Sequence, residues 1–92
     1  MAVTVKIPTP LRRLTGQQDK VSVEGDNISA VVENLEKQFP GIRERLCDDT
    51  GGLRHFVNVY VNGEDIRYID GIQTVVDNGD EVSIVPAVAG GN

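Results

Sequence analysis

One segment constrains the fold of this 92-residue chain more than any other, because residues 28–39 carry its only long helical pattern. The apolar residues of this segment recur at spacings of three, four and seven, which places them on one helical face: Ile28, Val31, Val32, Leu35 and Phe39. Asn27 is the expected N-cap, and Pro40 with Gly41 is expected to end the helix. One amphipathic helix covers one face of one sheet, so the sequence predicts an α+β layer pair whose other sheet face meets solvent or a partner.

Apolar and polar residues alternate on both sides of the helix, a pattern typical of half-buried strands. The expected strands are residues 2–8, 20–25, 56–62 and 81–86, with a short strand near residues 66–68. Residues 11–18 are expected to form the loop of a first hairpin, and residues 42–46 a short helical turn. Each predicted strand is short enough to lie within a single small sheet.

Two connections carry further structural signals. Asn62 and Gly63 are a pair favoured in tight hairpins, in a loop of either two or four residues. In the connection before the last strand, Val75 and Val76 are both expected to fill the core, and Asn78-Gly79 supplies another turn.

The order of the predicted elements narrows the fold. The first and last strands have long apolar alternations, which suits central positions in the sheet, whereas the short strand suits an edge. If these two strands are parallel neighbours, the architecture is the β-grasp (ubiquitin-like) fold, a mixed sheet of four to five strands packed on one main helix. We expect one β-grasp domain at residues 1–86 and a flexible C-terminal Gly-Gly tail at residues 87–92.

Composition excludes several classes of function. With 39% hydrophobic and 25% charged residues, the chain lies outside the regime of disordered proteins. Its formal net charge of −5 argues against nucleic acid as a partner and favours a protein partner with a basic surface. The sequence contains no transmembrane run and no signal-peptide pattern, so no membrane partner and a cytoplasmic location are expected.

A search for catalytic groups finds little. His55 is the only histidine and has no second base or nucleophile beside it in sequence, so a structural or surface role is expected. Cys47 precedes Asp48 and Asp49, whose charge would raise the thiol pKa and make it a poor nucleophile. One cysteine cannot ligate an iron-sulfur cluster, and no cofactor motif is present, so no cofactor or resident metal is expected.

The C-terminal segment "VPAVAGGN" has a composition that packing does not explain. The residues become smaller toward the end, from Val88 through Ala89 to Gly90 and Gly91, so a narrow channel could close around the backbone. Five residues after Pro86 would span roughly 17 Å if extended, enough to enter a deep site in another protein. The alternative is a disordered terminus, since chain ends are often glycine-rich and poorly ordered.

With a β-grasp element order, the segment "DNGDEVSIVPAVAGG" resembles the ubiquitin-like sulfur carriers of the MoaD/ThiS family, and the resemblance covers essentially the whole chain. Within that family, "VKIPTPLRRLTG", "RHFVNVYVNGEDIR" and "VPAVAGG" are most similar to the carrier that serves cysteine biosynthesis. The resemblance implies that an E1-like ATP-dependent enzyme adenylates the carboxylate of Gly91 and that the product becomes a thiocarboxylate. A sulfur-accepting enzyme, such as a cysteine synthase, would then take the sulfur.

The resemblance also implies which residues a partner would contact. Val88, Ala89 and Gly90 would be recognised as the tail. Family carriers dock through the sheet face opposite the helix, where the expected partner interface is Phe56, Tyr60, Val85 and Pro86.

Asn92 departs from the family pattern, because its amide bond to Gly91 uses up the carboxylate that must be activated. Three explanations are open: a zinc metalloprotease that cleaves between Gly91 and Asn92, an artificially added residue, or loss of the carrier role. A precursor that needs removal of Asn92 is the favoured one. Alternative functions are a molybdopterin-synthase-type small subunit, a ubiquitin-like modifier that forms isopeptide bonds through Gly91, and a plain interaction domain.

Overall fold

The computed structural model describes residues 2–86. Its strands are β1 (Ala2–Lys6), β2 (Lys20–Glu24), β3 (Val57–Val61), β4 (Glu64–Asp65) and β5 (Glu81–Pro86). Its helices are α1 (Ile28–Gln38) and α2 (Ile42–Leu46), with the 3-10 helices η1 (Thr9–Thr15), η2 (Ile66–Tyr68) and η3 (Gly71–Gln73). No helix within residues 2–86 is long and apolar enough to cross a bilayer.

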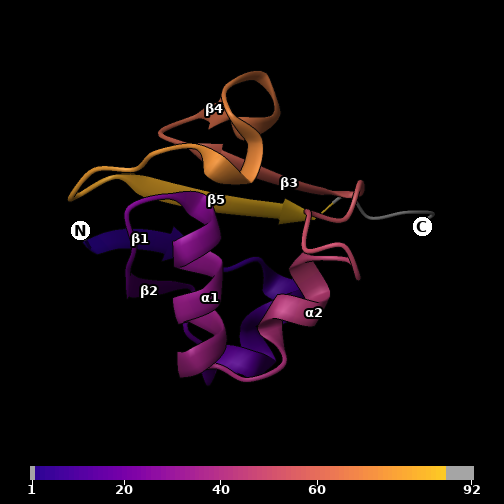
Figure 1. Cartoon of the computed structure of the whole chain (residues 1–92). Helices are drawn as coiled ribbons and strands as arrows, with labels where there is room; N and C mark the ends of the chain where they lie inside the picture. Colours follow the sequence, from indigo (N-terminus) through magenta and orange to yellow (C-terminus); the bar gives the residue numbers. More distant parts are fainter. Residues whose placement is uncertain (1, 87–92) are drawn as a thin grey trace.

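The five strands form one mixed sheet in the order β2-β1-β5-β3-β4 (Figure 1). β1 and β5 are parallel, with Val5 opposite Val82, and all other neighbours are antiparallel. The first and last strands are therefore adjacent and central, and the short β4 is an edge strand. These pairings confirm the predicted β-grasp fold.

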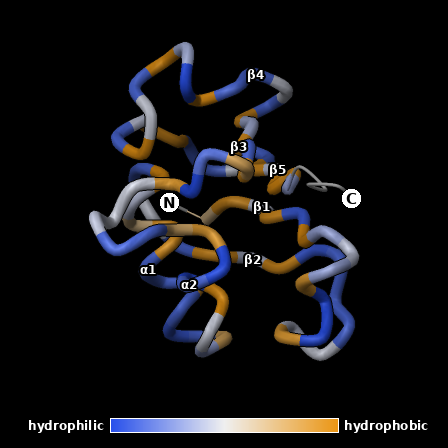
Figure 2. The backbone as a smooth tube through the Cα atoms, turned by 90° about the vertical axis from the view of Figure 1, so that its right-hand side faces the viewer, coloured by the Kyte–Doolittle hydropathy of each residue, from blue (hydrophilic) through white to orange (hydrophobic). Residues whose placement is uncertain are grey.

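The core lies between one face of the sheet and α1 with α2, which cover that face together (Figure 1). Ile28, Val31, Val32 and Leu35 of α1 are buried, as their spacing predicts, and Phe39 packs against the core from its edge. The Asn27 side chain caps α1 by accepting a hydrogen bond from the Ala30 amide at 2.8 Å. Hydrophobic residues recur along β1 and β5 in the middle of the molecule (Figure 2).

The region after β3 differs from its prediction. The turn is the two-residue one, since Val61 pairs with Glu64 and both Asn62 and Gly63 have positive φ. The strand expected near residues 66–68 is instead β4 at Glu64–Asp65 followed by η2. The Asp65 carboxylate accepts a hydrogen bond from the Arg67 amide at 2.9 Å, which caps the 3-10 turn and ends the strand.

Two connections were also wrongly predicted. Residues 11–18 were expected to form a loop, but residues 9–15 form η1, and its Leu11 is buried in the core. Val76 is 1% exposed as predicted, whereas Val75 is 69% exposed. Neighbouring side chains of an extended segment point in opposite directions, so only one of the two valines faces the core.

Candidate functional site

The predicted partner interface has two described parts. Tyr60 and Val85 lie on the sheet face opposite α1, where Tyr60 pairs with Ser83 and Val85 pairs with Asn58. Val85 is 45% exposed there, and Tyr60 is half-buried. The tail recognition residues Val88, Ala89 and Gly90, the attachment residue Gly91 and the cleavage partner Asn92 all lie outside the described residues.

Phe56 and Pro86 lie at the end of the sheet rather than on its open face. Phe56 precedes β3 and is 39% exposed, and the next residue, Val57, pairs with Pro86. Both line a groove of about 410 Å³. Its other lining residues come from η1, from α2 and from the segment before β3: Pro10, Leu11, Glu44, Arg45, Leu46, Arg54 and Val57. The groove reaches Pro86, the last described residue, at the end of β5 (Figure 1).

Arg67 holds the segment that forms one wall of this groove. Its Nη2 donates to the carbonyl oxygens of His55 at 2.9 Å and Val57 at 2.8 Å, and its Nη1 donates to the Asn58 side chain. A planar guanidinium has several N–H donors and can therefore donate to several neighbouring oxygen acceptors at once. Sequence reasoning missed this residue, because ten positions separate Arg67 from Val57 and no local pattern connects them.

Charge is segregated between the two ends of the sheet. β1 and β5 are parallel, whereas β2 is antiparallel to β1 and β3 is antiparallel to β5. The first residues of β2 and β3 therefore lie at the end of the sheet where β5 ends. We call residues 8–20, 44–46, 54–57 and 86 the tail end, and residues 24–26, 62–65 and 77–81 the turn end. The acidic residues of the turn end are Glu24, Asp26, Glu64, Asp65, Asp77, Asp80 and Glu81.

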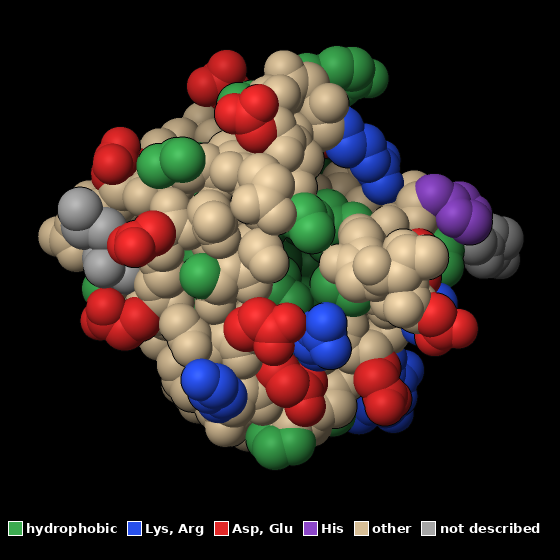
Figure 3. Space-filling model, viewed as in Figure 1, with side chains coloured by type: hydrophobic (Ala, Val, Ile, Leu, Met, Phe, Trp, Pro, Cys, Tyr) green, Lys and Arg blue, Asp and Glu red, His purple; other side chains and the backbone are tan. Residues whose placement is uncertain are grey.

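The turn end contains no basic residue among its members. The tail end has two acidic residues, Asp19 and Glu44, against the basic residues Arg12, Arg13, Lys20, Arg45 and Arg54. The space-filling view shows acidic side chains predominating at the left, away from the C-terminus (Figure 3). The net charge of −5 therefore does not describe the surface from which the C-terminal segment leaves.

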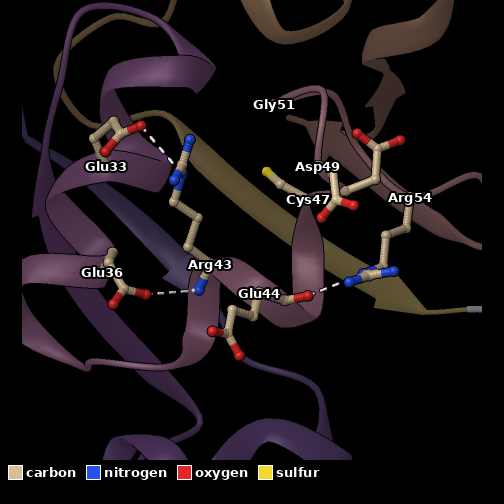
Figure 4. Close-up of a pocket in the computed structure, with 9 residues that line it drawn as sticks. Glu33, Glu36, Arg43, Glu44, Cys47, Asp49, Gly51 and Arg54 are labelled. Carbon is tan, nitrogen blue, oxygen red and sulfur yellow. Dashed lines mark hydrogen bonds and ion pairs between the residues drawn. The ribbon is translucent and has the colours of Figure 1, made fainter.

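A second hollow lies on the helix face, lined by residues of α1, α2 and the loop after α2 (Figure 4). Several of its charged groups are engaged in local structure. Glu33 pairs with Arg43 at 3.2 Å, and the Glu36 carboxylate accepts from the amides of Gly41 and Arg43 at the start of α2. The hydrogen bonds from these amides, the Arg43 amide first, lower the pKa of Glu36. This hollow is explained by the way α2 is held against α1.

Cys47 borders the helix-face hollow and is buried. Burial raises the pKa of its thiol, and the charge of Asp48 raises it further, while Arg43 acts in the opposite direction. A protonated thiol is a poor nucleophile. The sequence-based expectation that Cys47 does not act as a nucleophile agrees with this environment.

The β-grasp body, in which the central strand β5 ends at Pro86, defines the chain as a small ubiquitin-like protein. Comparison with protein families then gives a match to the ThiS family over residues 5–91. The chain belongs to the ThiS family.

Three relatives place the chain within this family. Sulfur carrier protein CysO of Mycobacterium tuberculosis is 53% identical over 93 residues, an alignment that covers 99% of this chain and 100% of the relative. A chain of the crystal structure of the Amycolatopsis orientalis BexX/CysO complex is 43% identical, with a TM-score of 0.91 and coverage of 97% and 99%. Small archaeal modifier protein 3 of Haloferax volcanii is 34% identical over 93 residues and 99% of this chain, with 100% of the relative covered.

Proposed function

We propose that the chain is a sulfur carrier protein whose Gly91 carboxylate, released by removal of Asn92, is activated and converted to a thiocarboxylate. The 53% identity over the whole chain to Sulfur carrier protein CysO carries this proposal. The family match runs to residue 91 and so includes the Gly-Gly pair. The name of that relative supports cysteine biosynthesis as the destination of the sulfur.

The proposed chemistry divides one difficult substitution into two easier ones. In an E1-like enzyme, a carboxylate oxygen of Gly91 attacks the α-phosphorus of ATP and releases pyrophosphate, which leaves an acyl-adenylate. The sulfur of a sulfide donor then attacks the acyl carbon and expels AMP, so that the chain ends in a thiocarboxylate. The partner enzyme supplies the catalytic groups, and this chain is a protein cosubstrate rather than an enzyme.

The proposal assigns separate roles to two parts of the chain. Residues 1–86 form the folded body that partners recognise, and residues 87–92 form the tail that enters their active sites. A zinc metalloprotease that cleaves after Gly91 would produce the active form. The sulfur-accepting enzyme, such as a cysteine synthase, would contact the same end of the body because the tail leaves from it.

The first experiment compares a chain that ends at Gly91 with the chain that retains Asn92. Each is incubated with the E1-like enzyme of the same organism, ATP and a sulfide source, and intact mass is measured. The chain ending at Gly91 is expected to gain about 16 Da as sulfur replaces oxygen, whereas the Asn92 chain stays unchanged. If the Gly91 chain never gains this mass, the carrier proposal is wrong.

A second candidate function is protein modification, which the 34% identity to Small archaeal modifier protein 3 favours. In that case the activated Gly91 would form isopeptide bonds with lysines of other proteins. Immunoblots of cell lysate would show bands of higher mass that resist reducing agents. If only the free protein is seen while the Gly91 chain accepts sulfur in vitro, the carrier function stands alone.

A further inference from the structure

The groove at the tail end, which Phe56 and Pro86 line, is the surface with the least structural explanation in the molecule. Apolar side chains from three separate segments meet there, including Leu11, Leu46 and Val57. Phe56 remains 39% exposed, with its ring edge-on to His55 at a centroid distance of 5.8 Å. An apolar hollow with an exposed aromatic residue beside it is typical of a protein-binding site.

The rim of this groove is mainly basic. Arg45 is exposed and forms no ion pair with another residue of the described chain. Arg54 is held in place because its Nε donates to the Glu44 carbonyl oxygen at 2.9 Å. Arg54 is half-buried, and Arg13 of η1 adds a second exposed arginine, after Arg45, at the same end of the molecule.

The acidic residues of the turn end do not cancel the positive potential that the arginines create at the groove. The five residue steps of β5 from Glu81 to Pro86 separate the two ends by roughly 17 Å, at about 3.3 Å per step. The Debye length is about 8 Å at physiological ionic strength, so a surface at the tail end interacts mainly with the nearby arginines. A molecule of net charge −5 can therefore attract an acidic surface at this end.

The position of the groove determines which partner reaches it. Pro86 lines the groove and is also the residue from which the proposed tail extends. Gly91 lies five residues further along, within roughly 17 Å of Pro86. Any enzyme that holds Gly91 in its active site must therefore rest against the tail end.

We propose that the groove docks the tail-activating enzyme through an acidic surface that surrounds its channel and inserts one aliphatic or aromatic side chain between Phe56, Leu46 and Pro86. This inference rests on the proposed carrier function. The apolar contact contributes affinity, and the arginines contribute orientation and association rate. A similar chain, 43% identical to this one, occurs in the crystal structure of the Amycolatopsis orientalis BexX/CysO complex.

The test measures binding and charging separately, using the chain that ends at Gly91 and the E1-like enzyme of the same organism. The Arg45→Glu variant is expected to raise the Kd and lower kcat/KM by about tenfold at low salt, with kcat nearly unchanged. The difference should shrink as NaCl rises from about 0.02 M to about 0.5 M. The Phe56→Ser variant should weaken binding at every salt concentration, since it removes apolar contact.

Lys37→Glu is the matched control, because it makes the same change of charge at an exposed position of α1 outside the groove. It should change the Kd by less than about twofold. If Arg45→Glu behaves like Lys37→Glu, the docking proposal is wrong. If the wild-type chain binds the enzyme but never gains sulfur, the carrier proposal fails while the docking result stands.

A second copy of this chain is the competing occupant, since its acidic turn end would also complement the arginines. Sedimentation of the protein alone distinguishes the two cases. Self-association that weakens with salt and is lost in both Arg45→Glu and Asp77→Lys would assign the groove to a second copy and overturn the proposal. A monomer at all salt concentrations, together with salt-dependent binding of the enzyme, supports it.

Discussion

The two ends of the sheet are built from the same strands but are stabilised differently. At the turn end, Asp80 and Asn62 join two turns: the Asn62 side chain donates to the Asp80 carboxylate at 3.0 Å and accepts from the Glu81 amide at 3.0 Å. At the tail end, the long side chain of Arg67 reaches back to the segment before β3. The turn end is stabilised by hydrogen bonds between two neighbouring turns. The tail end is stabilised by the hydrogen bonds of one side chain, Arg67, beside an open groove.

This difference indicates how a small body can be both stable and accessible. The turn end has little role at an interface in the proposal, so its side chains are used to fix the sheet. The tail end must expose a binding groove beside the exit of the C-terminal segment, and it keeps apolar and cationic groups partly uncovered there. Three experiments on stability test whether the two ends differ in this way.

The largest expected difference is between two glycines, one at each end. An added Cβ at Gly25 would lie 2.8 Å from the backbone nitrogen of Val31, and backbone cannot move aside without shifting α1. Gly25→Ala should lower the free energy of unfolding by about 2–3 kcal/mol because of this clash. Gly16, with φ of 65° and no atom within 4 Å of an added Cβ, has space but a left-handed backbone.

Gly16→Ala is therefore the matched control at the tail end, with an expected loss of about 1 kcal/mol. Urea unfolding followed by circular dichroism measures both variants. Equal losses in the two variants would show that the packing of α1 against the turn end is looser than its contacts indicate.

Substitution of Arg67 is expected to change the free energy of unfolding by an intermediate amount. Arg67→Ala removes the hydrogen bonds to the His55 and Val57 carbonyl oxygens. It should therefore lower the free energy of unfolding by about 1–2 kcal/mol. Amide hydrogen exchange should increase mainly in the segment before β3, because the Arg67 hydrogen bonds hold that segment in place.

Arg67→Lys keeps the charge but replaces the planar fork with a single ammonium group. It should recover less than half of the loss, as measured by urea unfolding of the three proteins side by side. Full recovery by lysine would mean that charge, rather than the bidentate geometry, stabilises the segment.

The smallest effect is expected from Asp80→Asn at the turn end. The hydrogen bond from the Asp77 amide, followed by the one from the Asn62 side chain, lowers the pKa of Asp80 in the folded protein. A carboxyl with a lowered folded pKa contributes stability above its ordinary value of about 4 and loses it as the pH falls through the folded pKa. The wild type should therefore be slightly more stable than the variant near pH 7, by less than about 1 kcal/mol.

Thermal melting between pH 7 and pH 3 tests this dependence. The difference between wild type and Asp80→Asn should be constant above about pH 5 and should shrink below about pH 4. A difference that is unchanged at pH 3 would show that the shape of the side chain matters and its charge does not.

The fold was largely predictable from the sequence, because periodicity is a local property. The spacing of Ile28, Val31 and Leu35 predicts α1 and its buried face, and the alternation in β1 and β5 predicts two central strands. The errors occur where a local detail, such as one hydrogen bond or the direction of one side chain, decides the outcome. The Asp65 cap ends β4 early, and an extended backbone turns Val75 outward.

The candidate site was less predictable, since it depends on segments that meet only in three dimensions. Phe56 and Pro86 were predicted to be interface residues, and the groove that they line also includes Leu11 and Leu46 from elsewhere in the chain. Arginines spread over more than forty positions appear scattered in the sequence, and only the strand directions bring Arg12, Arg45 and Arg54 to one end.

The parallel pairing of β1 with β5 has a consequence for synthesis. The centre of the sheet joins residues 2–6 to residues 81–86, so the sheet cannot close until β5, which is about 75 positions later than β1, is available. A chain that stopped before residue 81 would lack both β5 and the groove wall at Pro86. A chain without β5 would therefore present neither a complete sheet nor a complete groove to a partner.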